Sequence, residues 1–318
     1  MFGDRPVNFP QQIDFLLVPG FSLFGLTSML DPLRHANRTA ERELYRWRLV
    51  SEQGGLISSS DGIEIMSQHN IRDVGKVQML IVCAGDNPEQ HITPGLVSFI
   101  RQQASHGAEI GSQDTAAYIV AAAGVLDGYR TTMHWENLPA AMSVYPRVSW
   151  VQELLVVDGK RFSCSGALSG LEMMLHLIRT QHGNGLAITV ADELIVTHER
   201  HHSDPQRASL QKRLDSRNPR LADAVQLMEN NIEEPLSMGE IAVHLGVSNR
   251  ELERLFKHYL QQTPGTYYRT LRLNQARWML QQTSHSVTDV AVACGFSSVA
   301  HFSRCYQRYF NVKPSRER

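Results

Sequence analysis

The sequence predicts two domains of different class, an α/β domain with a mostly parallel sheet followed by an all-α domain. Over the first two hundred residues, short apolar runs alternate with helical stretches of ten or more residues, the pattern of strands joined by crossover helices. The last eighty residues show only helical periodicity and contain an internal repeat. The length of 318 residues also exceeds the roughly 100 to 200 residues of a typical domain.

The strands of the first domain are predicted from apolar runs that end in turn residues. The first run is IDFLLVPG, and a helix containing LDPLRHANR follows it. VQMLIVCAGD is apolar almost throughout, which predicts a central strand covered on both faces. Further strands are expected at RWRLVSEQGG, at GIEIM and, as two or three strands, in VSWVQELLVVDGKRFSCSG. Helices are expected at about residues 95–104, in ALSGLEMMLHLIRTQHG and in GLAITVADELIVTHERHH, and this order indicates a flavodoxin-like fold with helices on both faces.

A stretch without a sustained apolar face separates the two domains. SDPQRASLQKRLDSRNPR, residues 203–220, contains two prolines and many charges, which indicates a linker. We therefore place a first domain at residues 1–202, a linker at residues 203–220 and a second domain at residues 221–318.

Composition and charge exclude several classes of protein. With 42% hydrophobic and 20% charged residues, the chain is neither disordered nor a coiled coil. It has no apolar run near the roughly 18 residues of a membrane span and no signal-peptide pattern, so we expect a cytoplasmic protein without a membrane partner. The net charge of −1 hides an asymmetry, because residues 236–318 carry +6 and the first 235 carry −7. This basic tail predicts that only the second domain meets a polyanion.

Metal, redox and cofactor motifs are not apparent. Four cysteines are scattered without a CxxC pair, and we expect them to be buried, reduced thiols: Cys83, Cys164, Cys294 and Cys305. The run HERHH has His198 and His202 four residues apart, but no acidic or cysteine partner stands at a ligand spacing. We interpret this run as the frayed end of a helix, and we expect no metal and no cofactor.

The second domain contains one pattern twice. IAVHLGVSNRELERLFKHYLQQTPG and VAVACGFSSVAHFSRCYQRYFNVKP each predict a short helix, a turn with glycine and a second helix, which is the helix-turn-helix arrangement. Gly246 and Gly295 are 49 residues apart, whereas Pro264 and Pro314 are 50 apart. The second copy therefore has one extra residue between Gly295 and Phe302.

Local signals support both copies. Three pairs have the spacing of a helix capping box: Ser237 with Glu240, Ser248 with Glu251, and Ser286 with Asp289. Apolar residues at helical spacing supply a core for each copy, first Ile241, Ala242, Leu245, Val247, Leu252, Leu255 and Phe256, then Val290, Ala291, Cys294, Phe296, Phe302 and Tyr306. Between them, YYRTLRLNQARWMLQQ predicts one connecting helix.

The outward side chains of each second helix match the edges of DNA bases. Arginine donates two hydrogen bonds to guanine, asparagine pairs with adenine, and valine or alanine contacts the thymine methyl group. The candidates are Asn249, Arg250, Arg254 and Lys257 in the first copy and Ser298, Val299, Ala300, His301, Arg304 and Arg308 in the second. Phosphate contacts, which position without specifying, are expected from Lys257, Arg269, Arg272 and Arg308. A merely solvated helix face is the alternative, and the two copies and the +6 charge argue against it.

Residues from about 236 to 316 resemble the DNA-binding domain of the AraC/XylS family, on the motifs IAVHLGVSNRELERLFK, TPGTYYRTLRLNQARWML and VAVACGFSSVAHFSRCYQRYFNVKPS. The resemblance implies two helix-turn-helix units on one linker helix, with recognition helices in successive major grooves. It implies base-reading positions at Arg250, Arg254, Val299, Ala300, His301 and Arg304. The chain departs from the family at its end, where RER follows Pro-Ser in place of a common Tyr-Arg.

The first domain is similar to the class I glutamine amidotransferase-like (PfpI-like) domain of one AraC subfamily, on LDPLRHANR, YRWRLVS, SSDGIEI, LIVCAG and AAAGVLDGYRTTMHW. That subfamily includes activators of catabolic genes for arginine, glycine betaine and carnitine. Its enzymatic relatives carry cysteine at a sharp turn from strand to helix. Here EIGSQDTAAYIVAAAG places Asp114 at that turn, and His134 resembles the histidine about twenty residues further on.

Three roles are open for Asp114. It could be a nucleophile, although no partner constellation is visible; it could cap the helix that follows; or it could hold the cationic end of an amine, guanidinium or quaternary ammonium, beside the aromatic face of Trp135. Ligands of open α/β sheets bind at the carboxyl ends of the strands. The candidate ligand-binding residues are Phe21, Asp86, Asn87, Asp114, Thr115, His134 and Trp135.

These patterns predict a transcriptional activator of catabolic genes that responds to a small cationic or betaine-like nitrogen compound and is not an enzyme. The expected partners are double-stranded promoter DNA, the small-molecule effector, RNA polymerase and a second copy of the chain in a homodimer. One alternative is a PfpI-like hydrolase or amidase fused to a DNA-binding module, against which the missing cysteine argues. Another is a DNA-binding protein that responds to a protein partner.

Overall fold

The structure is a computed structural model that describes residues 9–196, 200–202, 204, 206, 218–282 and 285–317. The chain divides into two compact units, Met1–Gln206 and Arg207–Arg318. Most of the expected linker lies outside the described residues, and helix α8 already begins at Pro219.

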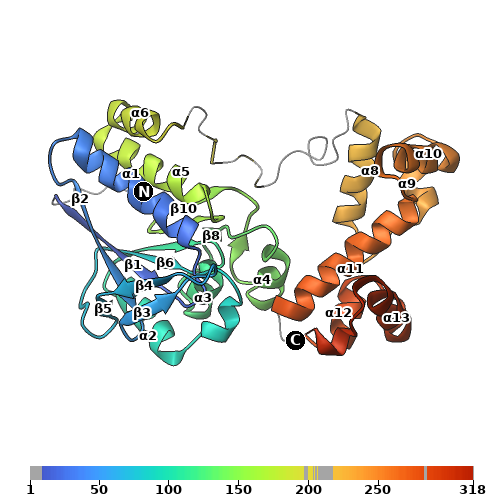
Figure 1. Ribbon diagram of the computed structural model, residues 1–318, viewed down its shortest axis with the longest axis horizontal. Coiled ribbons are helices and arrows are strands. Elements are labelled where there is room, and N and C mark those ends of the chain that lie inside the picture. Colours follow the sequence, from blue (N-terminus) through green and yellow to red (C-terminus); the bar gives the residue numbers. More distant parts are fainter. Residues whose placement is uncertain are drawn as a thin grey trace. The chain divides into compact units, whose positions relative to one another are not determined.

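A seven-stranded sheet forms the centre of the first unit, in the order β10-β11-β7-β6-β1-β2-β5 (Figure 1). Every pairing is parallel except that of β10 with β11, which confirms the expected α/β class. The strand VQMLIVC is central as predicted, and every residue of β6 is buried. The strands are β1 Gln11–Leu17, β2 Tyr45–Ser51, β5 His69–Asn70, β6 Met79–Cys83, β7 Glu109–Gln113, β10 Leu155–Asp158 and β11 Arg161–Cys164.

Helices cover both faces of this sheet (Figure 1). On one face lie α1 Leu23–Thr39, α5 Ser169–His182 and α6 Asn184–Glu193; on the other lie α2 Pro94–Ser105 and α3 Ala116–Ala122. Side chains of β1 alternate between the two layers, because successive residues of a strand point to opposite faces. Phe15 and Leu17 pack with α1 and α5, whereas Leu16 and Val18 pack with α2 and α3.

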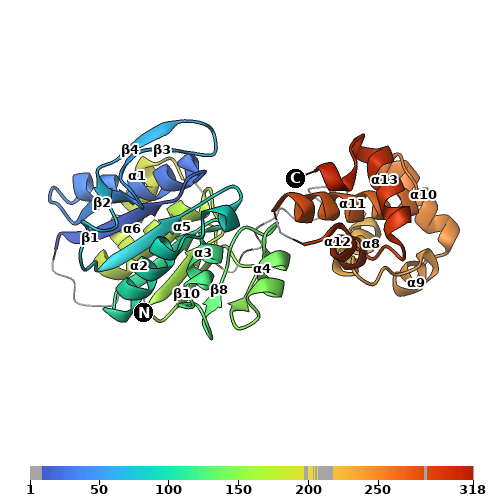
Figure 2. The same ribbon diagram turned by 90° about the horizontal axis from the view of Figure 1, so that it is seen from below.

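Short strands and helices outside the main sheet complete the first unit. Figure 2 shows the antiparallel pair β3 and β4 apart from the main sheet. The bounds are β3 Gly55–Ser58, β4 Glu64–Ser67, η1 Pro88–His91, β8 Arg130–Thr131, α4 Leu138–Val144 and β9 Ser149–Trp150.

The last helix of the first unit is shorter than the sequence predicts. It ends at Glu193, because Ile195 adopts a left-handed backbone with φ of 59° and Val196 N–H donates back to Ala191 O at 2.9 Å. HERHH is therefore not the end of this helix, which stops before it. His198 lies outside the described residues.

The second unit consists of helices around two small cores, as predicted. They are α8 Pro219–Asn230, α9 Met238–His244, α10 Asn249–Leu260, α11 Pro264–Gln282, α12 Val287–Ala293, α13 Val299–Phe310 and η2 Pro314–Arg316. Helix α11 connects the two helix-turn-helix units (Figure 1), and one core lies against each of its halves. Ser237 and Ser286 form full capping boxes, whereas Ser248 makes only its own bond, to Glu251 N–H.

The extra residue of the second copy lies in the turn. The capping serine follows the turn glycine by two residues in the first copy, as Ser248 after Gly246, and by three in the second, as Ser298 after Gly295. The helices and cores are therefore unaffected by the insertion.

The C-terminal segment is attached to the connecting helix through Glu317. Its side chain is 4% exposed and accepts hydrogen bonds from Arg277 Nε at 2.7 Å and Gln281 Nε2 at 2.9 Å. The Arg277 guanidinium also lies over the Phe310 ring, 4.7 Å from its centroid. Glu317 thus joins η2, α11 and α13 in the region where the chain departs from the AraC pattern.

We expect Glu317→Ala to destabilise the second helix-turn-helix unit by about 1–3 kcal/mol, because it leaves two donors without their shared acceptor. Hydrogen exchange of α11 and α13 amides in the full chain measures this change. The exposed Glu253 of α10 provides the control, and Glu253→Ala should change these rates little. Equal protection in both variants would show that Glu317 does not hold this segment.

Candidate functional site

The two predicted recognition helices expose the residues expected to read DNA. Ser248 and Ser298 cap α10 and α13 through their hydroxyl oxygens. Leu252 and Phe256 lie on the buried face of α10, and Phe302 and Tyr306 lie on the corresponding buried face of α13. The opposite faces carry the exposed candidates Asn249, Arg250, Arg254, Lys257, Ser298, Ala300, His301, Arg304 and Arg308, whereas Val299 is half-buried.

Two of these candidates also have structural contacts. Ser298 Oγ accepts the N–H of His301 at 3.1 Å, which orients the first turn of α13. The His301 ring lies 3.4 Å from the half-buried thiol of Cys305 and 6.1 Å, between ring centroids, from Phe296. His301 is therefore held at the start of the helix while remaining exposed.

Arg272 was expected to contact phosphate, and the structure gives its side chain contacts within the protein. Its Nε donates to Cys294 O at 2.7 Å, and one terminal nitrogen donates to Gly295 O at 2.5 Å. The guanidinium also stacks over Phe296, 4.3 Å from the ring centroid. Arg272 thus joins α11 to the turn of the second unit, whereas Arg269, one turn earlier, is exposed.

In the first unit the turn from β7 into α3 has the geometry of a nucleophile elbow. Asp114 adopts a left-handed backbone with φ of 60°, and its N–H donates to Cys164 O on β11 at 3.1 Å. Gly166 lies against its carboxylate, and a Cβ at this glycine would come within 2.5 Å of Asp114 Oδ2. The turn is therefore enclosed by the end of β11 and accepts no larger residue at position 166.

Burial and a second carboxylate change the charge of Asp114. Desolvation and, to a smaller extent, the nearby Asp86 raise its pKa to about 7, while a backbone hydrogen bond at Thr115 opposes both. The carboxyl group therefore gains or loses a proton close to neutral pH. Burial also raises the pKa of Cys164, to about 12, and that of Cys83, so neither thiol is ionised.

The structure brings some predicted ligand residues together and gives others a structural role. Asp86 is exposed and Asn87 half-buried on the loop beside Asp114. The Thr115 hydroxyl is buried and donates to Gly85 O at 2.5 Å, which ties the two loops together. Phe21 is fully buried in the core beneath α1, so its side chain packs in the interior.

His134 and Trp135 lie next to each other between β8 and α4, with ring centroids 5.4 Å apart. Burial lowers the pKa of His134, partly offset by Glu136 and Asn137. Segment 131–135 is tied to β11, because Thr132 N–H donates to Ser163 Oγ at 2.9 Å. The aromatic pair and the elbow are thus both attached to the end of one strand.

Sequence reasoning missed Gln113, which immediately precedes the elbow. This side chain is 0% exposed and packs against Gly25 of α1, and within the described residues neither its oxygen nor its nitrogen has a hydrogen-bond partner. A buried amide without partners is costly, by about 1–3 kcal/mol for each group. A polar residue at the end of an apolar strand is the signal that could have identified it.

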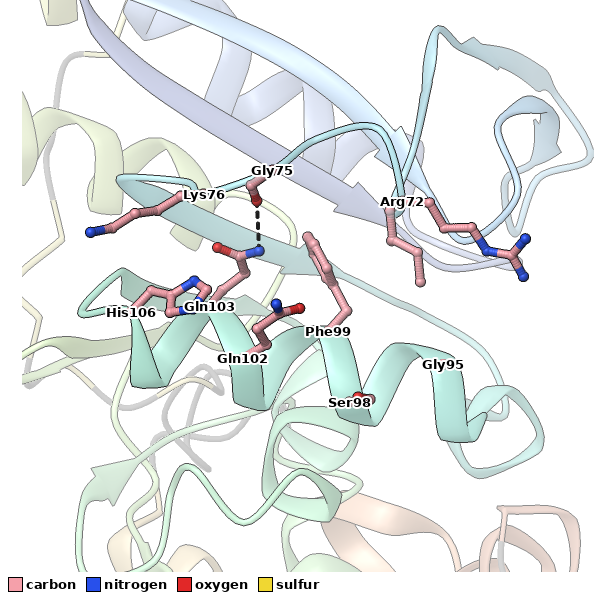
Figure 3. Close-up of a pocket in the computed structure, with 10 residues that line it drawn as sticks. Arg72, Gly75, Lys76, Gly95, Ser98, Phe99, Gln102, Gln103 and His106 are labelled. Carbon is pink, nitrogen blue, oxygen red and sulfur yellow. Dashed lines mark hydrogen bonds between the residues drawn. The ribbon is translucent and has the colours of Figure 1, made fainter.

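A groove of about 430 Å³ runs along α2, away from the elbow (Figure 3). Gln103 forms its floor by donating to Gly75 O at 2.8 Å and accepting from Val77 N–H at 3.0 Å. None of the predicted ligand residues lines this groove.

The remaining expectations concern metals, thiols and membranes. Among the described residues, no three His, Cys, Asp or Glu side chains gather as a metal site. Cys83, Cys164 and Cys294 are buried free thiols as expected, but Cys305 is only half-buried. No helix in the described ranges has the length and apolarity needed to cross a bilayer.

Comparisons with known proteins identify both units. The DJ-1/PfpI family matches residues 11–180, and a helix-turn-helix domain matches residues 241–318. The chain is 42% identical to the HTH-type transcriptional regulator GbdR of Pseudomonas aeruginosa, over 97% of this chain and 84% of that protein. It is 34% identical to the HTH-type transcriptional regulator GlxA of Rhizobium meliloti, over 96% and 94% of the two chains.

Solved structures resemble the first unit. An AraC family transcriptional regulator from Pseudomonas putida matches with a TM-score of 0.53 and 27% identity, over 58% of this chain and all of that one. DJ-1beta of Drosophila melanogaster matches with a TM-score of 0.51 and 20% identity, over 59% and 99% of the two chains, which shows a shared fold.

The contrast between Arg269 and Arg272 gives a test on DNA. On an operator selected from random duplexes with the full chain, Arg269→Ala should reduce the slope of log affinity against log salt by about 1, as expected for one lost phosphate contact. Arg272→Ala should weaken binding with the slope unchanged, because the residue orients the second unit. A lower slope in Arg272→Ala would restore the phosphate assignment.

Proposed function

We propose a specific function for this chain on one premise: it belongs to the AraC-type helix-turn-helix transcriptional regulators that carry an N-terminal DJ-1/PfpI domain. It is therefore a transcriptional regulator that binds DNA. Within this family, we propose that it activates catabolic genes in response to a small nitrogen-containing cation or zwitterion. The observation that carries the proposal is the elbow at Asp114, where an acidic pair stands in place of a thiol.

The effector is proposed to bind between Asp114 and Asp86. The negative charge of Asp86 raises the pKa of Asp114, and a cation bound beside both carboxyl groups would relieve this repulsion. The neighbouring Gln113 amide, buried without partners, supplies donor and acceptor groups for a polar ligand. His134 and Trp135 are the aromatic groups proposed to contact the effector, as cation–π interactions favour amines and quaternary ammonium groups.

The first unit is proposed to sense rather than catalyse. A hydrolase of this fold needs an ionisable thiol at the elbow, and Asp114 occupies that position. Cys83 and Cys164 are fully buried with raised pKa values, so they do not replace it. The named full-length relatives are transcriptional regulators, which supports the same interpretation.

Promoter recognition is proposed to use both recognition helices of each chain. We propose that the exposed Arg254 and Arg304 read bases and that the exposed Arg269 and Lys257 contact phosphates. We further propose a cytoplasmic homodimer formed through the first unit, in which residues between 203 and 220 link effector binding to DNA binding and RNA polymerase is contacted at the promoter.

Single substitutions on the recognition helices test the DNA assignment. Arg254→Ala and Arg304→Ala should each cost about 1–3 kcal/mol at a selected operator and relax specificity at one position. Binding to duplexes mutated at each base pair measures this, with the exposed Gln307 of α13, changed to Ala, as the control. Wild-type specificity in both arginine variants would overturn the assignment of α10 and α13.

The effector site has a pH-dependent signature. A cation binds the ionised form of Asp114, so below pH 7 binding must release the proton that the carboxyl group holds. Affinity for a permanent cation should therefore rise by up to about tenfold per pH unit toward pH 7 and level off above it. Calorimetry with glycine betaine, L-carnitine and L-arginine, after thermal-shift screening, measures this dependence.

Two variants complete this experiment. Asp114→Asn keeps a residue that tolerates the left-handed backbone but should bind weakly and without the pH dependence. Asp223→Asn, at an exposed position on α8, should bind as the wild type does. Wild-type affinity in Asp114→Asn for a compound that binds would exclude Asp114 as the cation contact.

A further inference from the structure

The end of the first unit is held by specific hydrogen bonds just where the expected linker begins. The described residues 200–202, 204 and 206 are called the anchor segment here. We infer that this segment docks on the first unit as the element that couples the elbow to the DNA-binding unit. The inference rests on the proposed function, because it supplies the physical route between the effector and DNA.

Gln206 contacts the first unit through its side-chain nitrogen. Its side-chain nitrogen lies 3.0 Å from Thr132 Oγ1, 2.9 Å from Met133 O and 2.9 Å from Glu153 O. Thr132 and Met133 are fully buried, so two of the three acceptors are fixed by the core around them, whereas Glu153 is half-buried. They form a socket that accepts an amide donor from the start of the linker.

His202 completes the docking at the edge of the sheet. Its carbonyl oxygen accepts the N–H groups of Leu154 at 3.0 Å and Leu155 at 3.4 Å. Strand β10 is the edge strand on this side, and the carbonyl of His202 supplies an acceptor to the amides at its start. Arg200 N–H also donates to Glu172 Oε1 at 3.0 Å, which fixes the start of the segment against α5.

Two short series of contacts join this socket to the elbow. In the first, Asp114 N–H donates to Cys164 O, and the next residue, Ser165, donates its N–H to Leu154 O at 2.9 Å. The N–H of Leu154 in turn donates to the carbonyl oxygen of His202. In the second, Ser163 Oγ on β11 accepts the N–H of Thr132, and Thr132 Oγ1 accepts a hydrogen bond from Gln206 Nε2. The end of β11 therefore contacts both the elbow and the two supports of the anchor segment.

The socket also adjoins the proposed effector contacts. Met133, whose carbonyl accepts from Gln206, immediately precedes His134 and Trp135. A cation that draws these rings toward Asp114 would move the Met133 carbonyl relative to Gln206. Undocking would free the anchor segment from the first unit and so lengthen the stretch of chain between the first unit and α8. The docked and undocked forms thus differ in the positions that the DNA-binding unit can reach.

Hydrogen exchange on the full chain, without DNA or effector, tests the docking. Gln206→Ala should raise exchange in segments 131–134 and 152–156 by about tenfold or more, because the groups that close this region lose their partner. Gln102→Ala, at an exposed position on α2, is the matched control and should leave both segments unchanged. Unchanged exchange in Gln206→Ala would overturn the docking.

The coupling is tested by combining Gln206→Ala with Asp114→Asn at the elbow. Asp114→Asn should change exchange in segment 152–156 of the otherwise wild-type chain but not in the Gln206→Ala background. Gln206→Ala should also change affinity for the selected operator, within the range of about 5- to 150-fold found for allosteric coupling. Exchange that responds to Asp114→Asn equally in both backgrounds, or operator affinity unaltered by Gln206→Ala, would overturn the coupling role.

Failure of the two proposals can be distinguished. If neither glycine betaine, L-carnitine nor L-arginine binds while exchange behaves as expected, the proposed effector class is wrong and the docking stands. If one of these compounds binds and Asp114→Asn abolishes it, but Gln206→Ala changes neither exchange nor operator affinity, the effector site stands and the anchor inference is wrong.

Discussion

The left-handed turn at Asp114 is the constraint on which the first unit depends. A residue with a Cβ is disfavoured in this conformation by roughly 1–2 kcal/mol, so its surroundings must hold it there. Cys164 does so by accepting the Asp114 N–H, and Gly166 does so by leaving space for the carboxylate. At the end of β11, Cys164 thereby bonds the elbow, and its neighbours Ser163 and Ser165 bond the residues that hold the anchor segment. The turn has a backbone geometry that suits a nucleophile, but in this chain it carries the carboxyl group of Asp114 in place of a thiol.

The second unit depends in the same way on its connecting helix. Two helix-turn-helix units read one DNA face only if the angle between them is fixed, and each core alone is too small to fix it. Arg272 bonds the turn of the second unit to α11, and Arg277 bonds the C-terminal segment through Glu317. Arg272 and Arg277 on this helix thus hold the parts of the second unit together, while the charged candidates on α10 and α13 are exposed.

Much of this architecture was predictable from sequence because its signals are local. Apolar periodicity identified the central strand, serine caps identified the helix starts, and the repeat identified both DNA-reading units. Tertiary partners were not predictable in the same way. Nothing local distinguishes Arg272, which bonds carbonyls 22 residues away, from the exposed Arg269. Likewise, the docking of Gln206 depends on acceptors more than fifty residues earlier, and the burial of Phe21 depends on the whole core.

The charge of the molecule restricts how an effector can act on DNA binding. A single cation bound at the elbow changes the net charge of residues 1–235, formally −7, by one unit. Exposed charges are screened beyond roughly 8–10 Å at physiological salt, so a single charge acts on DNA directly only over such short distances. Effector and DNA can then be linked only through unequal affinity for two arrangements of the chain. We propose that the docked and undocked forms of the segment ending at Gln206, which is hydrogen-bonded to Thr132, Met133 and Glu153, are two such arrangements.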